Sequence, residues 1–302
     1  MSRPASAHQS QQSMQQSQSM QQSQSIQQSQ TIYELDKKYH NKMVEVKFAN
    51  DQISQSIVKK IFPIPNINPN TAPNNFRFTN VSIFSVTPID QSIFTADLLD
   101  YFYKSEQLSA KILTDVGAGV GGNVWSLAKK VKHVNAVEMN VLQSKMLEHN
   151  MKILGIKNLT IHNANYVQVR YEMSQDILFA DPPWGGLDYK NQGEYITEYE
   201  YEGKKYPINQ ITKTTKAELI ILKLPVNHSV KCFDSIKKHI YVFDIYAEKQ
   251  KQGKKFINPL YKIVILSDFE ALRHIPYDEL SSKKIKKQIF PYFNFRSAKF
   301  LL

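Results

Sequence analysis

Residues 111–123 decide the fold, and they read Lys-Ile-Leu-Thr-Asp-Val-Gly-Ala-Gly-Val-Gly-Gly-Asn. After the lysine, the segment is apolar apart from a threonine and Asp115, which is typical of a strand buried in a sheet. Glycines then follow in the spacing G-x-G-x-x-G, which allows a tight turn and lets a ligand approach the backbone closely. The stretch therefore predicts a strand, a nucleotide-binding turn and a helix, which is how a doubly wound α/β domain begins.

Strand and helix patterns alternate from this turn onward. Helices are predicted over 123–130 and 141–154, and strands over 111–116, 133–138, 159–162, 176–180, 218–224, 239–246 and 261–267. This alternation predicts a mostly parallel sheet with helices on both faces. The connection 249–255 is too short for a helix, so the last two strands should pair antiparallel. The predicted fold class is a doubly wound, Rossmann-like sheet of seven strands that ends in an antiparallel hairpin, with an N-terminal helical extension.

The composition divides the chain into four segments. Residues 1–30 repeat glutamine and serine, and a segment so poor in apolar side chains is predicted to be disordered. Residues 31–105 are predicted to form an extension that completes the substrate pocket, with Thr87 capping a helix. Residues 106–270 would form the catalytic domain, and residues 271–302 a basic, aromatic C-terminal tail.

The charge balance limits the partners that the chain would bind. It has 302 residues, a formal charge of +11 and a pI of about 9.4. This surplus is typical of a nucleic-acid partner, although a lysine-rich proteome would give the same balance. No apolar run approaches the ~20 residues of a membrane span, so no membrane partner is expected. One cysteine and scattered histidines favour neither disulfides nor a metal site.

The basic segments 249–255 and 283–287 lie next to aromatic residues and could hold RNA, with a solvated lysine face as the alternative. Residues 283–287 read Lys-Lys-Ile-Lys-Lys and have the composition of a nuclear import signal. They predict a nuclear location. The alternatives are the cytoplasm, or a viral factory if the source is a large DNA virus.

A second motif, Asp181-Pro-Pro-Trp-Gly-Gly186, follows the fourth predicted strand. Two prolines stiffen this loop because each fixes φ near −65° and removes an N–H donor. Asp181 can accept a hydrogen bond from an exocyclic amino group, and Trp184 offers a face on which a base can stack. This is the chemistry that an amino-group methyltransferase needs.

The residues around the glycine turn discriminate between two cofactors. Glu138 ends the second strand, where a carboxylate can accept both ribose hydroxyls of either NAD or S-adenosylmethionine. Asp115 can accept from the α-ammonium of S-adenosylmethionine but would repel a pyrophosphate, so S-adenosylmethionine is favoured. Asn163 and Asn165 follow the third strand and would contact the adenine, or simply form a polar loop.

These motifs occur together with Ser85-Val86-Thr87-Pro88, which precedes the sheet. In this combination the chain resembles the trimethylguanosine synthase family, the RNA cap guanine-N2 methyltransferases, over roughly residues 76–270. The resemblance implies S-adenosylmethionine as cofactor, capped RNA as partner and the exocyclic N2 of 7-methylguanosine as methyl acceptor. A monomer that needs no metal is expected.

The resemblance and the residues together predict a site with three groups of side chains. For catalysis they are Asp181, Pro182 and Trp184. For the cofactor they are Thr87, Asp115, Gly117, Gly119, Asn123, Glu138, Asn163 and Asn165. For the substrate they are Lys38, Ser85, Asn150, Pro183, Trp184 and Asn227.

The chain departs from the family at several positions. Asp181 stands where the family usually has serine, and Val226 stands where it often has an arginine that reaches the cap phosphates. Lys223 and His228 lie nearby and are candidates to replace that arginine. The segment 192–207, which contains four tyrosines, also differs from the family.

The predicted mechanism depends on positioning. A cationic 7-methylguanine should stack on Trp184, with a cation–π contribution of about 0.5–2 kcal/mol. Asp181 and the Pro182 carbonyl would hold the N2 hydrogens, and the methyl group would transfer in line. The alternatives are an adenine-N6 or other amino methyltransferase of RNA or DNA, and a catalytically silent RNA-binding relative.

Overall fold

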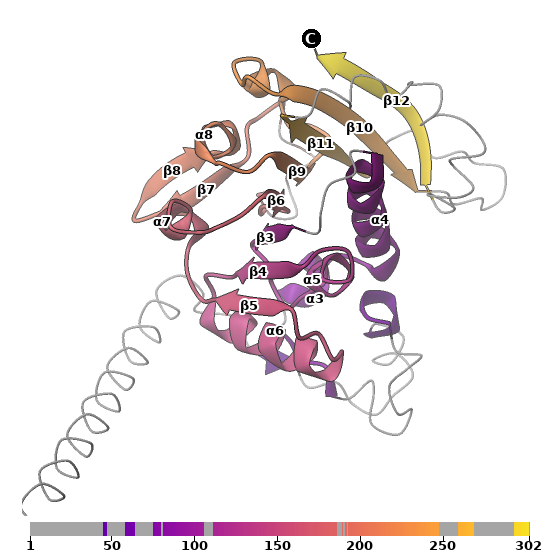
Figure 1. Cartoon of the computed structure of the whole chain (residues 1–302), viewed down its shortest axis with the longest axis vertical. Helices are drawn as coiled ribbons and strands as arrows, with labels where there is room; N and C mark the ends of the chain where they lie inside the picture. The colour runs from indigo at the N-terminus through magenta and orange to yellow at the C-terminus, as the bar shows by residue number, and fades with distance from the viewer. Residues whose placement is uncertain are drawn as a thin grey trace, which may run out of the picture. The chain divides into compact units, whose positions relative to one another are not determined.

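The glycine turn follows the strand β3 (Ile112–Val116), which lies inside a mixed eight-stranded sheet (Figure 1). The order of the strands is β12-β10-β11-β9-β6-β3-β4-β5. The computed structural model describes residues 45–46, 58–63, 75–79, 81–105, 111–185, 189, 191, 193–247, 259–268 and 293–301. All of these belong to one unit, Glu45–Leu302.

The parallel half of the sheet places the candidate site. From β3 the chain proceeds to β4 (His133–Val137) and β5 (Leu159–His162) on one side, then returns to β6 (Ile177–Ala180) on the other side of β3. β9 (Leu219–Leu224) extends this side in parallel. In open α/β sheets, ligands bind outside the carboxyl ends of the strands where the strand order reverses. That point lies between β3 and β6.

The other half of the sheet is antiparallel. β11 (Tyr261–Ser267) lies between β9 and β10 (His239–Ala247) and pairs antiparallel with both. The predicted seven-stranded sheet with a final antiparallel hairpin is therefore confirmed. An eighth strand, β12 (Phe293–Leu301), pairs with β10. The sequence placed this segment in a tail because it lies far from its partner along the chain.

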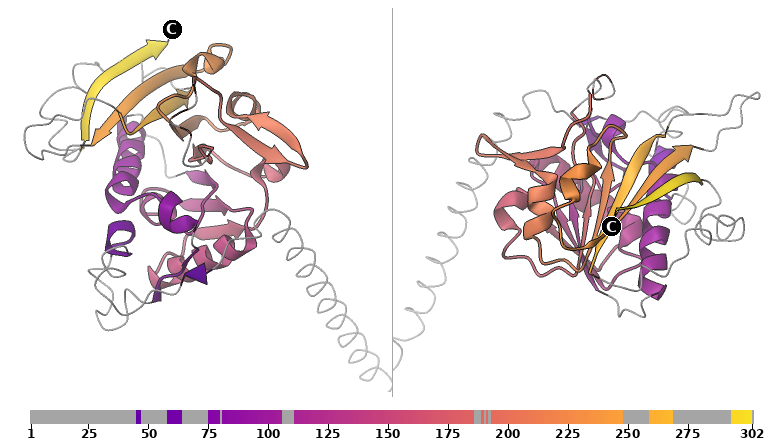
Figure 2. Two further views of the ribbon diagram at one scale, coloured as in Figure 1. Left: turned by 180° about the vertical axis from the view of Figure 1, so that it is seen from behind. Right: turned by 90° about the horizontal axis from the view of Figure 1, so that it is seen from above.

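Helices cover both faces of the sheet, as the view from above shows (Figure 2). One hydrophobic cluster joins the sheet to α4 (Ile89–Ser105), α5 (Val124–Leu127) and α6 (Val141–Ile153). The other joins it to α7 (Tyr166–Val169) and α8 (Ile208–Thr214). All residues of β6 are buried because both faces are covered, so the strand has no polar alternation.

Three local features differ from the sequence-based expectation. The helix α5 has four residues instead of the predicted stretch 123–130. The segment 192–207 contains a hairpin of β7 (Glu198–Tyr201) and β8 (Lys204–Pro207). Before the sheet, β1 (Glu45–Val46) pairs with β2 (Phe78–Thr79), and α3 (Ser82–Ser85) follows. The predicted tail 1–30, Lys38 and the basic segments 249–255 and 283–287 lie outside the described residues.

Gly122 explains how the segment before the sheet reaches the cofactor turn. A Cβ at this position would lie 2.5 Å from Cγ2 of Val86 and 3.1 Å from the backbone N of Thr87. Atoms at such distances overlap, so one of the segments would have to move. Gly122 therefore serves the close packing of Val86 and Thr87 against the turn.

We predict that Gly122→Ala lowers the free energy of unfolding by about 1–3 kcal/mol, the usual cost of overpacking. The melting temperature should fall by about 2–4 °C for each kcal/mol. Gly193→Ala is the matched control, because a Cβ at that exposed position meets nothing within 4 Å. Equal melting temperatures for the two variants would contradict the close packing of the two segments.

Candidate active site

Charged side chains come together at the carboxyl ends of β3, β4, β6 and β9. We call this region, with Asp115, Glu138, Asp181 and Lys223, the crevice. Asp115 lies in β3, Glu138 directly follows β4, Asp181 follows β6 and Lys223 lies in β9. All four side chains are buried or nearly so. The sequence predicted the three carboxylates in this place, and the structure groups them.

Asp115 is the deepest of these carboxylates. It is 1% exposed, and its Oδ2 accepts no hydrogen bond among the described residues. Burial raises the pKa of Asp115 well above its usual value, and the neighbouring charges of Asp181 and Glu138 raise it further, while Lys223 opposes them. A buried, unpaired acceptor of this kind is suited to a cationic ligand.

The carboxylate of Glu138 is held by the backbone. Its Oε2 accepts from the N–H of Gly119 at 2.8 Å, and its Oε1 accepts from the N–H of Asn140 at 2.8 Å. Burial raises the pKa of Glu138, and these two bonds oppose the rise. Gly119 and Gly117 both have positive φ, as the predicted turn requires. Because the N–H of Gly119 already has a partner and is beside a carboxylate, the turn is poorly suited to a pyrophosphate.

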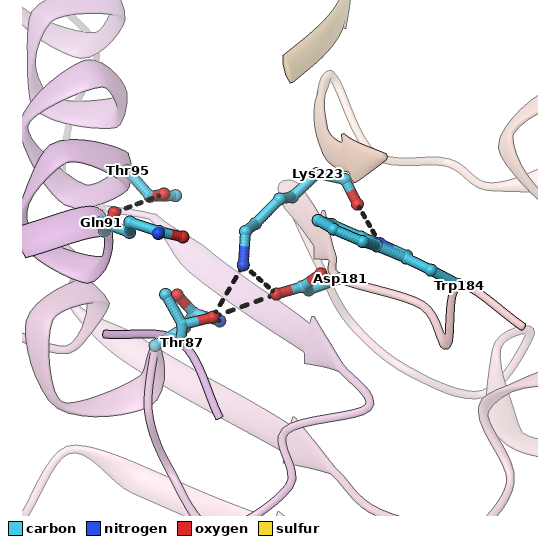
Figure 3. Close-up of polar contacts among 7 residues, drawn as sticks. Thr87, Gln91, Thr95, Asp181, Trp184 and Lys223 are labelled. Carbon is cyan, nitrogen blue, oxygen red and sulfur yellow. Dashed lines mark hydrogen bonds and ion pairs between the residues drawn. The ribbon is translucent and has the colours of Figure 1, made fainter. Parts of the chain in front are cut away.

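Asp181 forms a buried network with three other side chains (Figure 3). Its Oδ2 accepts from Nζ of Lys223 at 2.7 Å and from Oγ1 of Thr87 at 3.0 Å. The Thr87 hydroxyl in turn accepts from Nδ2 of Asn123 and from Nζ of Lys223, both at 3.0 Å. A hydroxyl has one proton and two lone pairs, so all three are used. The Thr87 hydroxyl therefore does not form the predicted helix cap, and the contact of Thr87 with the cofactor stays a prediction.

Trp184 lies beside this network and is half-buried. Its Nε1 donates to the carbonyl of Lys223 at 3.4 Å, and its own carbonyl accepts from the hydroxyl of Tyr195 at 2.8 Å. Tyr189 packs edge-on against the indole at 5.3 Å between ring centroids. Tyr261 lies at 6.4 Å on a tilted plane. Pro182 is buried, and Pro183 is exposed. The indole is thus fixed at its edge while part of its surface stays accessible.

Four predicted asparagines make contacts within the protein. Asn150 is fully buried and bonds the backbone of Arg77 and of Val120. Asn165 caps α7 and donates to the carbonyl of Glu200. Asn163 donates to the carbonyl of Glu138. Asn227 donates to the carbonyls of Tyr189 and Gly193. These bonds tie the four side chains to backbone groups of the protein. Their contacts to ligands stay predictions, as does that of the exposed Ser85.

The structure does not support Lys223 and His228 as replacements for the missing arginine. Lys223 is 5% exposed and ion-paired with Asp181, and His228 is 3% exposed. His228 lies 3.0 Å from the hydroxyl of Thr197, and burial lowers its pKa to about 4. Lys223 is therefore already paired and His228 is neutral at pH 7, so neither residue offers a free cation to a phosphate. The sequence showed only that both residues lie near Val226, not which way they are buried.

Tyr199 is a site residue that the sequence did not single out. It lies in β7, and its hydroxyl is buried without a hydrogen-bond partner among the described residues. Burial raises the pKa of Tyr199 well above 10, and the charges of Asp181, Tyr166 and Asp115 contribute. The phenol therefore stays protonated as a donor close to the carboxylates. Its only signal in the sequence is the high tyrosine content of the segment 192–207.

The described residues contain neither a cluster of metal ligands nor a membrane-spanning helix. No three His, Cys, Asp or Glu side chains in these parts of the chain are grouped as metal ligands. No helix among them is long and apolar enough to cross a bilayer.

Comparisons with known proteins agree with the motifs. An uncharacterised protein of Acanthamoeba polyphaga mimivirus is 34% identical over 145 residues, which cover 46% of this chain and 57% of that protein. The chain thus spans little more than half of this relative's length.

Two solved structures are also similar. A 16S rRNA guanine-N2 methyltransferase of T. thermophilus, in complex with AdoMet and guanosine, has a TM-score of 0.43 and 15% identity, covering 64% of this chain and 47% of that one. A putative RNA methyltransferase of Pyrococcus horikoshii has a TM-score of 0.38 and 14% identity, covering 57% and 83%.

The model of one protein family matches residues 110–266, which contain the glycine turn, Glu138, the Asp-Pro-Pro-Trp loop and Lys223. This match covers more than half of the chain. The protein belongs to the RNA cap guanine-N2 methyltransferase family.

Proposed function

We propose that the protein transfers a methyl group from S-adenosylmethionine to the exocyclic N2 of a 7-methylguanosine RNA cap, forming m2,7G, m2,2,7G or both. The observation that carries this proposal is the half-buried Trp184 beside the Asp181 carboxylate, next to the glycine turn. The family membership supports the same reaction. A nuclear location, a monomeric state and capped RNA as partner belong to this proposal.

The residues of the crevice fit S-adenosylmethionine. Two buried acceptors lack partners among the described residues, Oδ2 of Asp115 and Oδ1 of Asn123, and an ammonium group can satisfy both. Glu138 is held by two backbone N–H groups with lone pairs left for ribose hydroxyls. Among the described residues here, Asp115, Glu138 and Asp181 share one ammonium, that of Lys223, so a cationic ligand improves the charge balance.

When bound, the cofactor supplies a methyl group attached to a positively charged sulfur. The protein supplies orientation. Trp184 would carry the base, and Asp181 would accept a hydrogen bond from the amino group so that its lone pair faces the methyl carbon. Asp115 and Glu138 would hold this cofactor, and Asp181 and Trp184 would keep the acceptor nitrogen aligned with the methyl group that it would supply, while the displaced proton would leave to solvent.

The test of the substrate is a comparison of methyl acceptors. We expect transfer from labelled S-adenosylmethionine to m7GTP, much weaker transfer to GTP, and none to adenine-containing oligonucleotides of RNA or DNA. Nucleoside analysis of the product should place the label on N2. Label on adenine N6 would contradict the cap substrate and support an adenine-N6 methyltransferase, because the Asp-Pro-Pro-Trp motif by itself is compatible with both reactions.

Trp184 variants provide the control for stacking. Loss of the indole should reduce transfer to m7GTP by an amount equivalent to about 1–3 kcal/mol, the usual worth of one stacked base. Trp184→Phe should retain part of the rate, and cofactor affinity should change little in both variants. A Trp184→Ala enzyme as fast as the wild type would remove the indole from the base site.

Asp115→Asn provides a prediction about the cofactor. The charge-assisted bond to the α-ammonium should be lost, which weakens S-adenosylmethionine binding about 10- to 100-fold by calorimetry. The wild-type affinity should also fall as the pH is lowered through the raised pKa of Asp115, because the protonated acid no longer pairs with a cation.

The same variant should stabilise the ligand-free protein. Because the pKa of Asp115 is raised on folding, its ionised form destabilises the fold at neutral pH. Asp115→Asn should therefore raise the melting temperature at neutral pH, and the gain should shrink as the pH falls through the raised pKa. Asp268→Asn, at a half-exposed ion pair outside the crevice, should alter neither property. Unchanged cofactor affinity in Asp115→Asn would exclude Asp115 from the site.

A further inference from the structure

Lys223 contacts both ends of the Asp-Pro-Pro-Trp loop (Figure 3). Its ammonium binds Oδ2 of Asp181 at 2.7 Å, and its backbone carbonyl accepts from Nε1 of Trp184 at 3.4 Å. The ammonium also lies 5.5 Å from the centroid of the Trp184 ring and 5.3 Å from that of Tyr261. One residue of β9 therefore holds the two residues that would orient the acceptor.

The hydrogen-bond directions in this network are determined by the groups themselves. A lysine ammonium only donates, and an ionised carboxylate only accepts. The Thr87 hydroxyl must therefore accept from Lys223 and from Asn123 and give its single proton to Asp181. This arrangement is complete only when Lys223 is protonated and Asp181 is ionised.

The network uses one oxygen of Asp181 and leaves the other. Both bonds to the carboxylate end at Oδ2, and within the described part of the chain Oδ1 accepts none. The side chain is 15% exposed, so a ligand in the crevice can reach it. The orientation of the Asp181 carboxylate is therefore fixed through Oδ2, and Oδ1 remains able to accept a hydrogen bond.

A purely stabilising role explains this arrangement less well. Burying two charges costs desolvation, so a buried ion pair contributes little net stability compared with a neutral pair of similar size. Asp115 and Glu138 lie close by, and without Lys223 the described residues of the crevice would place three carboxylates together with no cation among them. The pair is better explained by the need to keep Asp181 charged and fixed.

We propose that Lys223 is a positioning residue for methyl transfer. Its ammonium and the Thr87 hydroxyl both bind Oδ2 of Asp181. Oδ1 is thereby left to accept a hydrogen bond from the amino group that is methylated. The backbone carbonyl of Lys223 binds Nε1 of Trp184 and so fixes the orientation of the indole. The inference rests on the proposed function only in that the acceptor carries an amino group. It holds for a guanine or an adenine.

The test uses the full chain with Lys223→Met, Asp181→Asn and the double variant, assayed on whichever acceptor the wild type methylates. We expect Lys223→Met to reduce kcat about 10²-fold, the usual cost of a misplaced reacting group, with a much smaller change in KM for S-adenosylmethionine. Its pH–rate profile should also differ from that of the wild type, because the ion pair between Lys223 and Asp181 is lost.

The double variant separates positioning from stability. A neutral methionine–asparagine pair should restore the melting temperature towards that of the wild type while kcat stays as low as in Asp181→Asn alone. Lys238→Met is the matched control, since Lys238 is also ion-paired, with Asp268, but outside the crevice. It should keep the wild-type kcat and pH profile.

Thr87→Val keeps the inference testable if Lys223→Met does not fold. It removes the hydroxyl but leaves the ion pair, and it should reduce kcat about tenfold, while Thr87→Ser should restore the rate. A wild-type kcat and pH profile in Lys223→Met, or a wild-type kcat in the double variant, would overturn the inference. A wild type that methylates adenine would overturn the cap substrate instead and leave Lys223 to be tested on that acceptor.

Discussion

The hydroxyl group of Thr87 joins three parts of the chain that are far apart in the sequence. It lies between the segment before the sheet, the glycine turn through Asn123, and the ends of β6 and β9 through Asp181 and Lys223. Gly122 allows this contact, because any larger residue would push Val86 and Thr87 away. The segment before the sheet is therefore part of the active site through one fully used hydroxyl group.

The charges of the crevice show a conflict between stability and binding. Burial raises the pKa values of Asp115 and Glu138, and the charges of Asp181 and Glu138 add to the rise at Asp115, so keeping these groups ionised costs stability. A cationic cofactor relieves this cost when it binds, which a neutral ligand would not do. Lys223 relieves part of this cost at Asp115, while its ammonium is hydrogen-bonded to Asp181. The excess of carboxylates thus favours a cationic cofactor over a dinucleotide.

The sequence predicted those parts of the fold that leave a local pattern. Buried strands such as β6 and β9 are continuous apolar runs, and the short connection after β10 indicated the antiparallel pair. Asp115, Glu138 and Asp181 could be placed because each lies at or just beyond a strand end, and parallel strand ends meet at one edge.

Other parts depend on contacts that no local pattern records. Lys223 is 42 residues from Asp181 and 136 from Thr87 along the chain. The local sequence therefore shows only a lysine within an apolar strand, without its partners. The hairpin β7–β8 is only partly buried, and its polar, tyrosine-rich strands resemble a loop. Asn150 was predicted to bind the substrate, but its buried amide bonds the backbone of residues 77 and 120, which only the packed structure reveals.

The most direct test of this account is a double-mutant cycle on the free energy of unfolding, with Thr87→Val and Lys223→Met made singly and together. If the hydroxyl and the ammonium belong to one network, the two effects should differ from additivity by about 0.5–3 kcal/mol. Effects that add within about 0.3–0.5 kcal/mol would show that the two groups act independently. That result would contradict the claim that the Thr87 hydroxyl joins the N-terminal segment to the active site.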